Sequence, residues 1–368
     1  MHIPFVSLYS PEKAALTDQI FADFRSTIES SQFILGAPVE QFESDFARVV
    51  GTRFAVGVNS GLDALILSLR ALGVGAGDEV ITAPNSFIAT AAAIDLVGAK
   101  TVFVDVDEDF NIDPRRIEAA LTSKTKAIMP VHLTGNPARM GDIMQIAKGR
   151  GLLVIEDAAQ AIGAMEGGIP VGGFGDVSAF SLHPLKNLHV WGDGGMMVTH
   201  SESIATSAKL QRNHGLKNRD EAEFFSFNSR LDTLQAIVGK HFLKLLEHTT
   251  EKRIHHANLY FSRLKHLGDR ITLPEVRPGV RHVFHVFQTR VKKRDALKTF
   301  LSEHGVETKI HYPIPIHWQK AAAHLGYKRG DFSVTDRLAT EILSLPIREN
   351  LREDEIHQIC DLIEAFET

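Results

Sequence analysis

The chain has 368 residues, of which 44% are hydrophobic and 23% are charged, and its formal net charge is −5. A chain of this length can form one large and one smaller domain, or one large domain with an appendage. Its composition is typical of a globular enzyme. A net negative charge without a long basic run argues against nucleic acid as a partner. The single cysteine, Cys360, excludes an internal disulfide and a multi-cysteine metal site, and it fits a reducing cytoplasm.

The N-terminus and the apolar stretches give no sign of secretion or membrane insertion. Residues 1–8 lack both the basic start and the long apolar run of a secretory signal. The most apolar stretches, 88–97 and 151–155, are much shorter than the roughly 20 residues that cross a bilayer. We therefore expect a cytoplasmic protein without a membrane partner.

The first 50 residues predict a helical arm that starts its first helix near Ser10-Pro11-Glu12. From about residue 54 to residue 200, short β-rich runs alternate with helical periodicity, which is typical of a layered α/β domain. Seven runs predict one broad sheet with strands at 54–58, 79–83, 101–106, 127–132, 152–156, 177–181 and 196–199. Helices between them are expected at 62–72, 88–97, 114–121 and 140–148.

Beyond residue 200 the pattern becomes mainly helical, and apolar periodicity from about 231 to 267 predicts a long segment suited to link two domains. Residues 268–279 are rich in glycine and proline and indicate a boundary. A small α+β domain is predicted from a strand at 282–291, a helix at 294–304, a short strand at 307–312 and two terminal helices. The expected division is an arm at 1–50, a large α/β domain at 51–267 and a small domain at 268–368.

Lys186 lies between a short apolar strand and the glycine-rich turn at 192–195. Hydroxyls and aromatic rings, rather than charges, accompany it in the sequence, and partial desolvation favours the neutral amine that forms imines with carbonyl compounds. A pyridoxal phosphate enzyme holds its cofactor in this way. The alternative is an ordinary solvated lysine before a turn.

Residues that follow the predicted strands matter most, because ligands of open α/β sheets bind beyond the carboxyl ends of the strands. Ser60 and Gly61 begin a helix whose N-terminus suits a phosphate. The alternative is a simple N-cap formed by Ser60 or Asn59. Phe87 follows the second strand, as a ring to stack on a planar cofactor or as a core aromatic. Of the acids Glu156 and Asp157, the second is the better candidate to hold a pyridine nitrogen protonated, and its alternative is an N-cap.

No motif supports a different chemistry. The glycines at 73–77 follow a helix and precede a strand, the reverse of a dinucleotide fingerprint, and neither a P-loop nor a serine-hydrolase elbow is present. The histidines include no His-Glu-x-x-His, and His282, His285, His311 and His317 lie in contexts where packed or solvated imidazoles are commoner than ligands. A metal site is therefore unsupported.

Ten short motifs follow one another along the chain. They are Ile3-Pro4-Phe5, Ile34-Leu35-Gly36 before Phe42-Glu43, Asn59-Ser60-Gly61-Leu62-Asp63-Ala64-Leu65, Gly77-Asp78-Glu79-Val80-Ile81, Glu156-Asp157-Ala158-Ala159-Gln160, Phe174-Gly175-Asp176, Lys186-Asn187-Leu188, Gly192-Asp193-Gly194-Gly195, Asn228-Ser229-Arg230-Leu231-Asp232 and Ile310-His311-Tyr312-Pro313. With them the chain resembles, over nearly its whole length, the DegT/DnrJ/EryC1/StrS family of sugar aminotransferases. The resemblance implies fold type I of the pyridoxal phosphate enzymes, an α/β fold with a mainly parallel seven-stranded sheet flanked by helices and a smaller C-terminal α+β domain.

The resemblance also implies a role for each site residue. Lys186 and Asp157 would be catalytic, the first as the Schiff-base lysine that shuttles a proton and the second as the partner of the pyridine nitrogen. The remaining cofactor-binding residues would be Gln160 near the phenolic oxygen, Phe87 stacked on the ring, and Ser60, Gly61, Leu62 and Ser181 around the phosphate. Family members are dimers, so Asn228 would reach the phosphate of the partner subunit. The expected substrate-binding residues are His183, His311 and Tyr312.

The implied reaction moves an amino group from an amino acid, expected to be L-glutamate, to a keto sugar that is expected to be nucleotide-linked. Residues 62–65, 186–188 and 192–195 look more like members that act on 3-keto sugars than like those that act on 4-keto sugars. Leu62 stands where many members have threonine, His183 where the 3-keto members often have tyrosine, and 189–191 replaces a small-residue stretch, so the regiochemistry stays open. A sugar dehydratase, which carries a histidine in place of Lys186, and a non-catalytic regulator are the alternatives.

Overall fold

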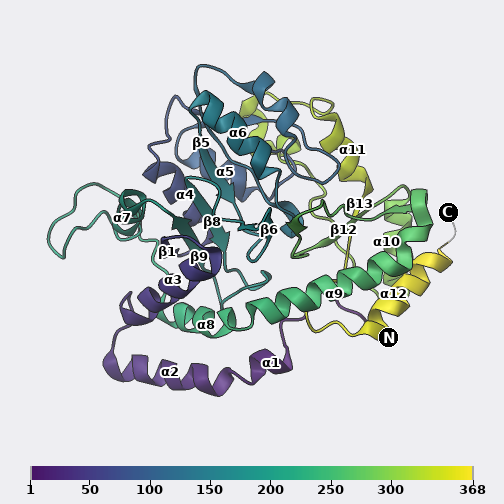
Figure 1. Cartoon of the computed structure of the whole chain (residues 1–368), viewed down its shortest axis with the longest axis horizontal. Coiled ribbons are helices and arrows are strands. Elements are labelled where there is room, and N and C mark those ends of the chain that lie inside the picture. Colours follow the sequence, from purple (N-terminus) through teal and green to yellow (C-terminus); the bar gives the residue numbers. More distant parts are fainter. Residues whose placement is uncertain (1, 367–368) are drawn as a thin grey trace.

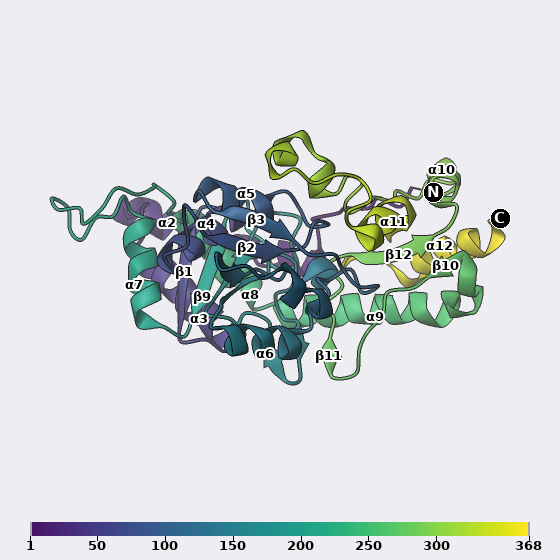
Figure 2. The ribbon, with the colours of Figure 1, turned by 90° about the horizontal axis from the view of Figure 1, so that it is seen from above.

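The computed structural model describes residues 2–366, and a seven-stranded sheet forms its centre (Figures 1 and 2). The strands are β1 (Phe54–Val58), β2 (Glu79–Thr82), β3 (Lys100–Phe103), β4 (Thr125–Ile128), β5 (Leu153–Asp157), β8 (Val177–Ser181) and β9 (Gly195–Thr199). Their order is β1-β9-β8-β5-β4-β2-β3, and every pair is parallel except the two that β9 makes. The predicted mainly parallel sheet is therefore confirmed.

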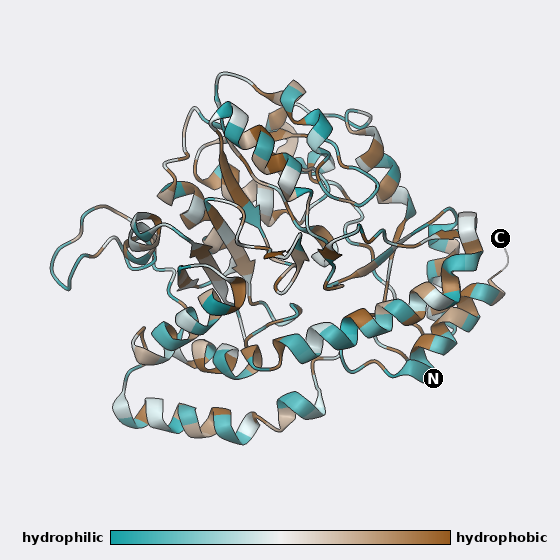
Figure 3. Cartoon of the chain, viewed as in Figure 1, coloured by the Kyte–Doolittle hydropathy of each residue, from teal (hydrophilic) through white to brown (hydrophobic). Residues whose placement is uncertain are grey.

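Both faces of the sheet are buried, because successive side chains of a strand point to opposite faces and helices cover each. On one face, Ala55 and Phe180 share a core with α3 (Ala37–Val50) and α8 (Thr233–Leu243). On the other, Val56 and Ala179 pack with the helices α4 (Gly61–Ala71), α5 (Ala89–Leu96) and α7 (Glu202–Gln211). Figure 3 shows the apolar strands inside and helices with one polar face outside. Polar groups of the sheet that could bind a ligand are thus confined to the strand ends.

A second core surrounds a smaller sheet of order β10-β12-β13. Its strands are β10 (Ile271–Thr272), β12 (Phe287–Val291) and β13 (Ile342–Leu345), and α10 (Arg294–Glu303) and α12 (Glu353–Ala365) pack on it. The helix α9 (Leu246–Leu264) follows α8 and runs from the large sheet to this core, where both termini of the chain lie (Figure 1). The predicted linking segment is therefore two consecutive helices.

Several predicted elements differ from the observed ones. Residues 114–121 form only the short 3₁₀ turns Pro114–Arg116 and Glu118–Ala120, since so short a segment gains little from helix propagation. Residues 307–312 contribute a single bridge, from Lys309 to Ser344, and the strand beside β12 is β13, which lies between α11 (Ser333–Glu341) and α12. The wrong prediction has a physical reason: the apolar run of β13 directly follows a helix and has no turn residues before it.

Two further elements pack around the large sheet. The helix α6 (Met140–Arg150) covers the β4–β5 half, and a small three-stranded sheet joins β6 (Met165–Glu166), β7 (Ile169–Pro170) and β11 (Val280–Arg281). None of the helices within residues 2–366 combines the length and apolarity that a membrane crossing requires. The division of the chain at residues 50 and 267 stays a prediction.

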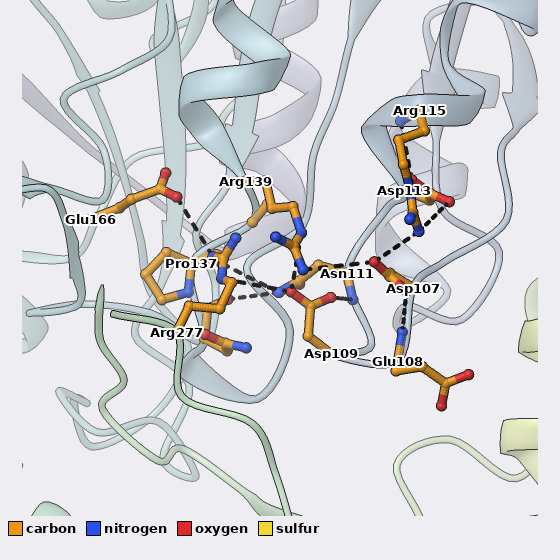
Figure 4. Close-up of polar contacts among 12 residues, drawn as sticks. Asp107, Glu108, Asp109, Asn111, Asp113, Arg115, Pro137, Arg139, Glu166 and Arg277 are labelled. Atoms are coloured by element: carbon orange, nitrogen blue, oxygen red, sulfur yellow. Dashed lines mark hydrogen bonds and ion pairs between the residues drawn. The ribbon is translucent and has the colours of Figure 1, made fainter. Parts of the chain in front are cut away.

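A group of buried charges fixes the loops around β6 and α6 (Figure 4). Arg277 Nη2 donates to the carbonyl oxygen of Pro137 at 2.5 Å and lies 3.7 Å from Glu166 Oε1, and Arg277 Nε lies 3.8 Å from Asp109 Oδ2. Burial raises the pKa of Asp109, although Arg277 and Arg139 attract its charged form. The group connects the segment before β11 to the loops that precede α6.

The N-terminal arm holds the two cores together. Ile3 bridges to Val306, α1 (Pro11–Ala14) and α2 (Thr17–Ser30) follow, and Trp191 packs against Phe21 and Phe24 of α2. The 189–191 stretch, which departs from the family pattern, thus contacts the arm.

Buried polar contacts anchor the arm at Lys13. Lys13 Nζ lies 2.5 Å from Glu349 Oε1 and 3.0 Å from His189 Nε2, and Arg253 Nη2 of α9 lies 3.3 Å from Glu349 Oε2. Burial alone would raise the pKa of Glu349, but the attraction of Arg253 and Lys13 outweighs it and lowers this pKa to about 2. Glu349 is therefore the counter-ion of two buried cations.

Replacing Glu349 with glutamine should lower the free energy of unfolding by about 3–5 kcal/mol at neutral pH, because it leaves Lys13 and Arg253 buried without a counter-ion. A carboxylate with a lowered folded-state pKa stabilises the fold above its unfolded pKa of about 4.3 and loses this contribution as the pH falls towards the folded value. The gap between variant and wild type, measured by urea unfolding from about pH 7 to about pH 3, should therefore shrink below about pH 4.3. Glu353→Gln, which removes an exposed pair with His255, is the control and should change stability little. A gap that widens in acid would contradict this role of Glu349.

Candidate active site

A cavity of about 420 Å³ lies at the carboxyl ends of β5 and β8, between the large sheet and the smaller core. The predicted site residues in its wall are Ser60, Gly61, Leu62, Phe87, Asp157, Gln160, Ser181, His183, Lys186, His311 and Tyr312. They come from five separate segments of the chain, and the fold brings them to one place. The volume of this cavity is within the range found for sites that bind small molecules.

Asp157 and Glu156, neighbours at the end of β5, point to opposite sides of the sheet. Glu156 is fully buried and accepts hydrogen bonds from the backbone N–H of Gly172 and Gly175, among others, while His132 Nε2 lies 3.1 Å from its Oε2. Asp157 lines the cavity, and burial raises its pKa despite hydrogen bonds that favour the charged form. The hydrogen bonds from the protein thus satisfy the carboxylate of Glu156. Those of Asp157 do not fully offset the cost of burying its charge, so Asp157 can interact with a cation in the cavity.

Thr90, which the sequence reasoning does not single out, orients Asp157. Its Oγ1 donates to Asp157 Oδ2 at 2.7 Å, and the N–H of Ala159 donates to Asp157 Oδ1 at 3.2 Å. Ser86 Oγ lies 2.8 Å from Thr90 Oγ1 and continues the network. The carboxylate is therefore held in one orientation by the first turn of α5 and the turn after β5.

Lys186 lies half-buried in the turn that follows β8, and its N–H donates to the carbonyl oxygen of His183 at 2.9 Å. Burial lowers the pKa of Lys186 to about 8, while the charge of Asp157 opposes the shift. With this pKa about a tenth of the amine is neutral at pH 7, against far less than about 1% for an ordinary lysine. The structure thus supplies a reactive amine beside a carboxylate.

The start of α4 packs unusually closely on the ends of β8 and β9. Gly195 pairs with both Val58 and Ser181 in the sheet, and a Cβ on Gly195 would lie 2.2 Å from the carbonyl oxygen of Ser60. A Cβ on Gly61 would lie 2.8 Å from Ser181 Cβ. Ser60 caps the helix, since its Oγ accepts from the N–H of Asp63 at 3.0 Å. The predicted cap and the predicted anion site can therefore coexist. The first N–H groups of α4 that have no partner within the helix lie beside the Ser181 hydroxyl in the cavity wall.

Gln160, Tyr312 and Phe87 form one side of the cavity. Gln160 Oε1 accepts from the N–H of Thr134 at 2.7 Å, and its Nε2 donates to the Tyr312 hydroxyl at 3.2 Å. Burial and the charge of Asp157 raise the pKa of Tyr312 to about 12, so the phenol keeps its proton. The Phe87 ring lies 5.6 Å from that of Tyr312 and is 53% exposed. A flat ligand therefore has an open aromatic face available.

His183 and His311 lie on the cavity wall with different surroundings. His183 is exposed, and its Nδ1 accepts from the N–H of Leu185 at 3.2 Å, which leaves the ring proton on Nε2. His311 Nδ1 lies 2.9 Å from Ser344 Oγ of β13, and burial lowers the pKa of His311 to about 4. Both side chains therefore line the cavity, one exposed and one largely buried.

Asn228 is the one predicted site residue that lies outside the cavity wall. It is exposed at the end of the 214–228 loop, which extends from the body beside α7 (Figure 1). Phe225 in the same loop is 100% exposed, and Phe224 and Phe227 are also exposed. The position of Asn228 fits a contact with another molecule rather than with this chain's own cavity.

The cavity wall includes charged and polar residues that the sequence does not indicate. Lys13, Arg253 and Glu349 belong to the cluster that anchors the arm, and His285 lies close to Lys186 in the wall. No local pattern marks them, because each is separated from the strand ends by a long stretch of chain.

The chain is similar to known proteins along its whole length. Residues 14–364 match the model of the DegT/DnrJ/EryC1/StrS aminotransferase family. A UDP-N-acetyl-3-dehydro-alpha-D-glucosamine 3-aminotransferase of Acidithiobacillus ferrooxidans is 43% identical over 362 residues, 98% of this chain and 97% of that protein. A pleiotropic regulatory protein of Geobacillus stearothermophilus is 42% identical over 368 residues, 100% of this chain and 99% of that protein. The crystal structure of S. venezuelae DesV in complex with a ketimine intermediate matches with a TM-score of 0.95 at 38% identity, and each chain is covered completely.

Proposed function

Since this chain belongs to the DegT/DnrJ/EryC1/StrS aminotransferase family, we propose that it transfers an amino group from an amino acid to the C-3 ketone of a nucleotide-linked deoxysugar, with pyridoxal phosphate as cofactor. The observation that carries the proposal is the meeting of Lys186 and Asp157 in one cavity at the strand ends. The names of relatives support the 3-keto position, among them a dTDP-3-amino-3,6-dideoxy-alpha-D-galactopyranose transaminase of Aneurinibacillus thermoaerophilus, 41% identical over 340 residues.

The cavity fits pyridoxal phosphate. The under-compensated carboxylate of Asp157 suits a protonated pyridine nitrogen, and the helix end beside Ser181, which two glycines keep close to the sheet, suits the phosphate. Ser60, Gly61 and Leu62 would bind that phosphate through their backbone, and Gln160 and Phe87 would contact the ring. When bound, the cofactor supplies an aldehyde that exchanges amines and a ring that accepts electrons.

The chain's own residues would supply proton transfer and orientation. Lys186 Nζ, with its lowered pKa, would move a proton from the α-carbon of the amino donor to the aldehyde-derived carbon of the cofactor in the first half-reaction, and from that carbon to C-3 of the sugar in the second. Asp157 would keep its partner nitrogen protonated, and Thr90 would keep Asp157 oriented. Tyr312 accepts its hydrogen bond from Gln160, so its own hydroxyl proton is free for a substrate oxygen.

Gly195→Ala should weaken cofactor retention strongly, because the added Cβ collides with the backbone carbonyl of Ser60 and displaces the start of α4. We expect the dissociation constant of pyridoxal phosphate to rise at least about tenfold, since phosphate contacts depend on sub-ångström placement. Equilibrium dialysis measures this directly. Gly141→Ala is the control, because a Cβ at Gly141 in α6 meets nothing within 4 Å. An unchanged constant in Gly195→Ala would contradict the placement of the phosphate.

Several finer features belong to the same proposal. L-glutamate is the proposed amino donor, and a homodimer is proposed in which Asn228 reaches the phosphate of the partner subunit. The exposed phenylalanines beside Asn228 support such an interface. Cys360 is buried and unpaired, which supports a cytoplasmic location.

The decisive experiment incubates the purified protein with glutamate and a panel of 3-keto and 4-keto nucleotide sugars and identifies products by mass spectrometry and NMR. We expect amination at C-3 of one nucleotide sugar. Exclusive amination at C-4 would reject the proposed regiochemistry, and elimination of a hydroxyl without amine transfer would favour a dehydratase. The lysine at position 186 argues against the latter, because the dehydratases that resemble this family carry a histidine there.

A non-catalytic regulator is the alternative that two relatives suggest by name. They are the pleiotropic regulatory protein and the erythromycin biosynthesis sensory transduction protein EryC1 of Saccharopolyspora erythraea, 42% identical over 364 residues. A regulator has no need of an amine with a lowered pKa beside a fixed carboxylate, which favours the enzyme. Bound cofactor without amine transfer from any donor would reverse that preference.

A further inference from the structure

His285 lies in the cavity wall, and the reaction described above gives it no role. It belongs to the segment before β12, and its Nδ1 lies 3.3 Å from Oδ1 of Asn187, the residue after Lys186. Asn187 is buried, and its Nδ2 donates to the carbonyl oxygen of Val283 at 3.1 Å. One side chain thus connects the lysine turn to the histidine.

The contacts of Asn187 determine which nitrogen of His285 carries the proton. The Val283 carbonyl can only accept, so the amide nitrogen of Asn187 must face it and the amide oxygen must face His285. The oxygen accepts, so Nδ1 of His285 is the nitrogen that carries hydrogen. In a neutral ring Nε2 is then an acceptor. Burial and the nearby positive charges of Lys186 and Arg253 lower the pKa of His285 well below its usual range, so the ring stays neutral.

The charged and titratable groups around His285 leave its Nε2 unengaged. The charged groups that lower its pKa are those of Lys186, Arg253, His311 and His183. Within residues 2–366, His285 Nε2 has no hydrogen-bond partner. His183 offers the opposite group, an Nε2–H donor, to the same cavity. The wall therefore presents one histidine that donates and one that accepts.

We propose that His285 Nε2 accepts a hydrogen bond from a hydroxyl group of the sugar, and that Asn187 is the positioning residue that fixes this tautomer. The inference rests on the proposed function. Of the two substrates, the amino donor brings carboxylates, which only accept hydrogen bonds at neutral pH, and its amine is required at the reacting carbon. A sugar brings hydroxyl donors. His285 is thus a specificity-determining residue of the sugar half-reaction.

The test separates the two half-reactions of the cofactor-loaded enzyme. In His285→Phe, the spectral change of the cofactor on adding glutamate alone should keep its rate within about twofold, while KM for the keto sugar that the wild type aminates should rise about tenfold or more, because a buried hydroxyl loses its acceptor. His285→Gln can donate to Asn187 Oδ1 and still present an oxygen, so it should recover most of the sugar KM. If His285→Phe fails to fold, His285→Leu takes its place in the comparison with His285→Gln.

A second variant tests the role of Asn187. Asn187→Leu should raise the sugar KM in the wild-type background but add little to His285→Phe, because Asn187 acts on the sugar only through the tautomer of His285. His241→Gln is the control: this buried histidine pairs with Asp23 outside the cavity, 2.8 Å from its Oδ2, and its loss should leave both half-reactions unchanged.

The possible outcomes distinguish this proposal from the proposed function. An unchanged sugar KM in His285→Phe, or equal losses in both half-reactions, overturns the role of His285 while the wild type still aminates its sugar. A wild type that aminates no sugar in the panel overturns the proposed function itself. Additive effects of Asn187→Leu and His285→Phe overturn the positioning role of Asn187.

Discussion

Lys186→Ala should lower the rate of amine transfer by at least about 10³-fold, because it removes both the amine that binds the cofactor and the group that moves the proton. Lys186 lies half-buried in the cavity wall, and burial lowers its pKa to about 8, which favours the neutral amine that the proposed function requires. Added alkylamines cannot replace it fully, since they lack its fixed orientation beside Asp157.

The measurement combines steady-state turnover with the visible absorption of lysine-bound cofactor, which this variant should lack. Lys148→Ala is the matched control, because Lys148 is an exposed lysine of α6 outside the cavity. Full turnover by Lys186→Ala would remove the basis of the proposed function.

Asp157→Asn should lower kcat by about 10²–10³-fold, since an amide keeps the shape of the side chain but not the charge that stabilises a protonated pyridine nitrogen. The amide oxygen can still accept from the Thr90 hydroxyl, so the fold of the cavity should persist. Burial raises the pKa of Asp157 despite its hydrogen bonds and the nearby charge of Lys186, so we expect a protonated pyridine nitrogen to lower this pKa and cofactor binding to gain affinity from the pair.

Single-turnover rates with glutamate measure this effect without interference from the sugar. Asp176→Asn is the control: Asp176 Oδ2 accepts from the N–H of Val154 at 2.8 Å, at the opposite end of the strands, and its replacement should affect stability rather than kcat. A rate for Asp157→Asn equal to that of the wild type would show that another group faces the pyridine nitrogen.

The positions of the seven strands along the chain and the residues that follow them were predictable because they depend on local patterns, whereas the order of the strands in the sheet was not predicted. Short β-rich runs between helical segments located the seven strands of the large sheet, and the rule that ligands bind beyond the carboxyl ends of strands pointed to Lys186 and Asp157, which both line the cavity. The alternation of side chains along a strand explains why Asp157 rather than Glu156 lies in the cavity wall: consecutive residues of β5 face opposite sides. Gly61 and Gly195 also belong to recognisable motifs, but the close packing that requires them becomes visible only when α4 lies on the strand ends.

By itself, then, the sequence determined the strands of the sheet and the lysine and carboxylate that follow them, each of which depends on residues close together along the chain. The tertiary structure alone decided what surrounds them. Thr90 meets Asp157 across 67 positions, His285 meets Asn187 across 98, and Lys13 meets Glu349 across 336. No local periodicity encodes such contacts, because they arise where separate elements pack, and there the protonation of Lys186, Glu349 and His285 is set by burial and by charges from distant segments.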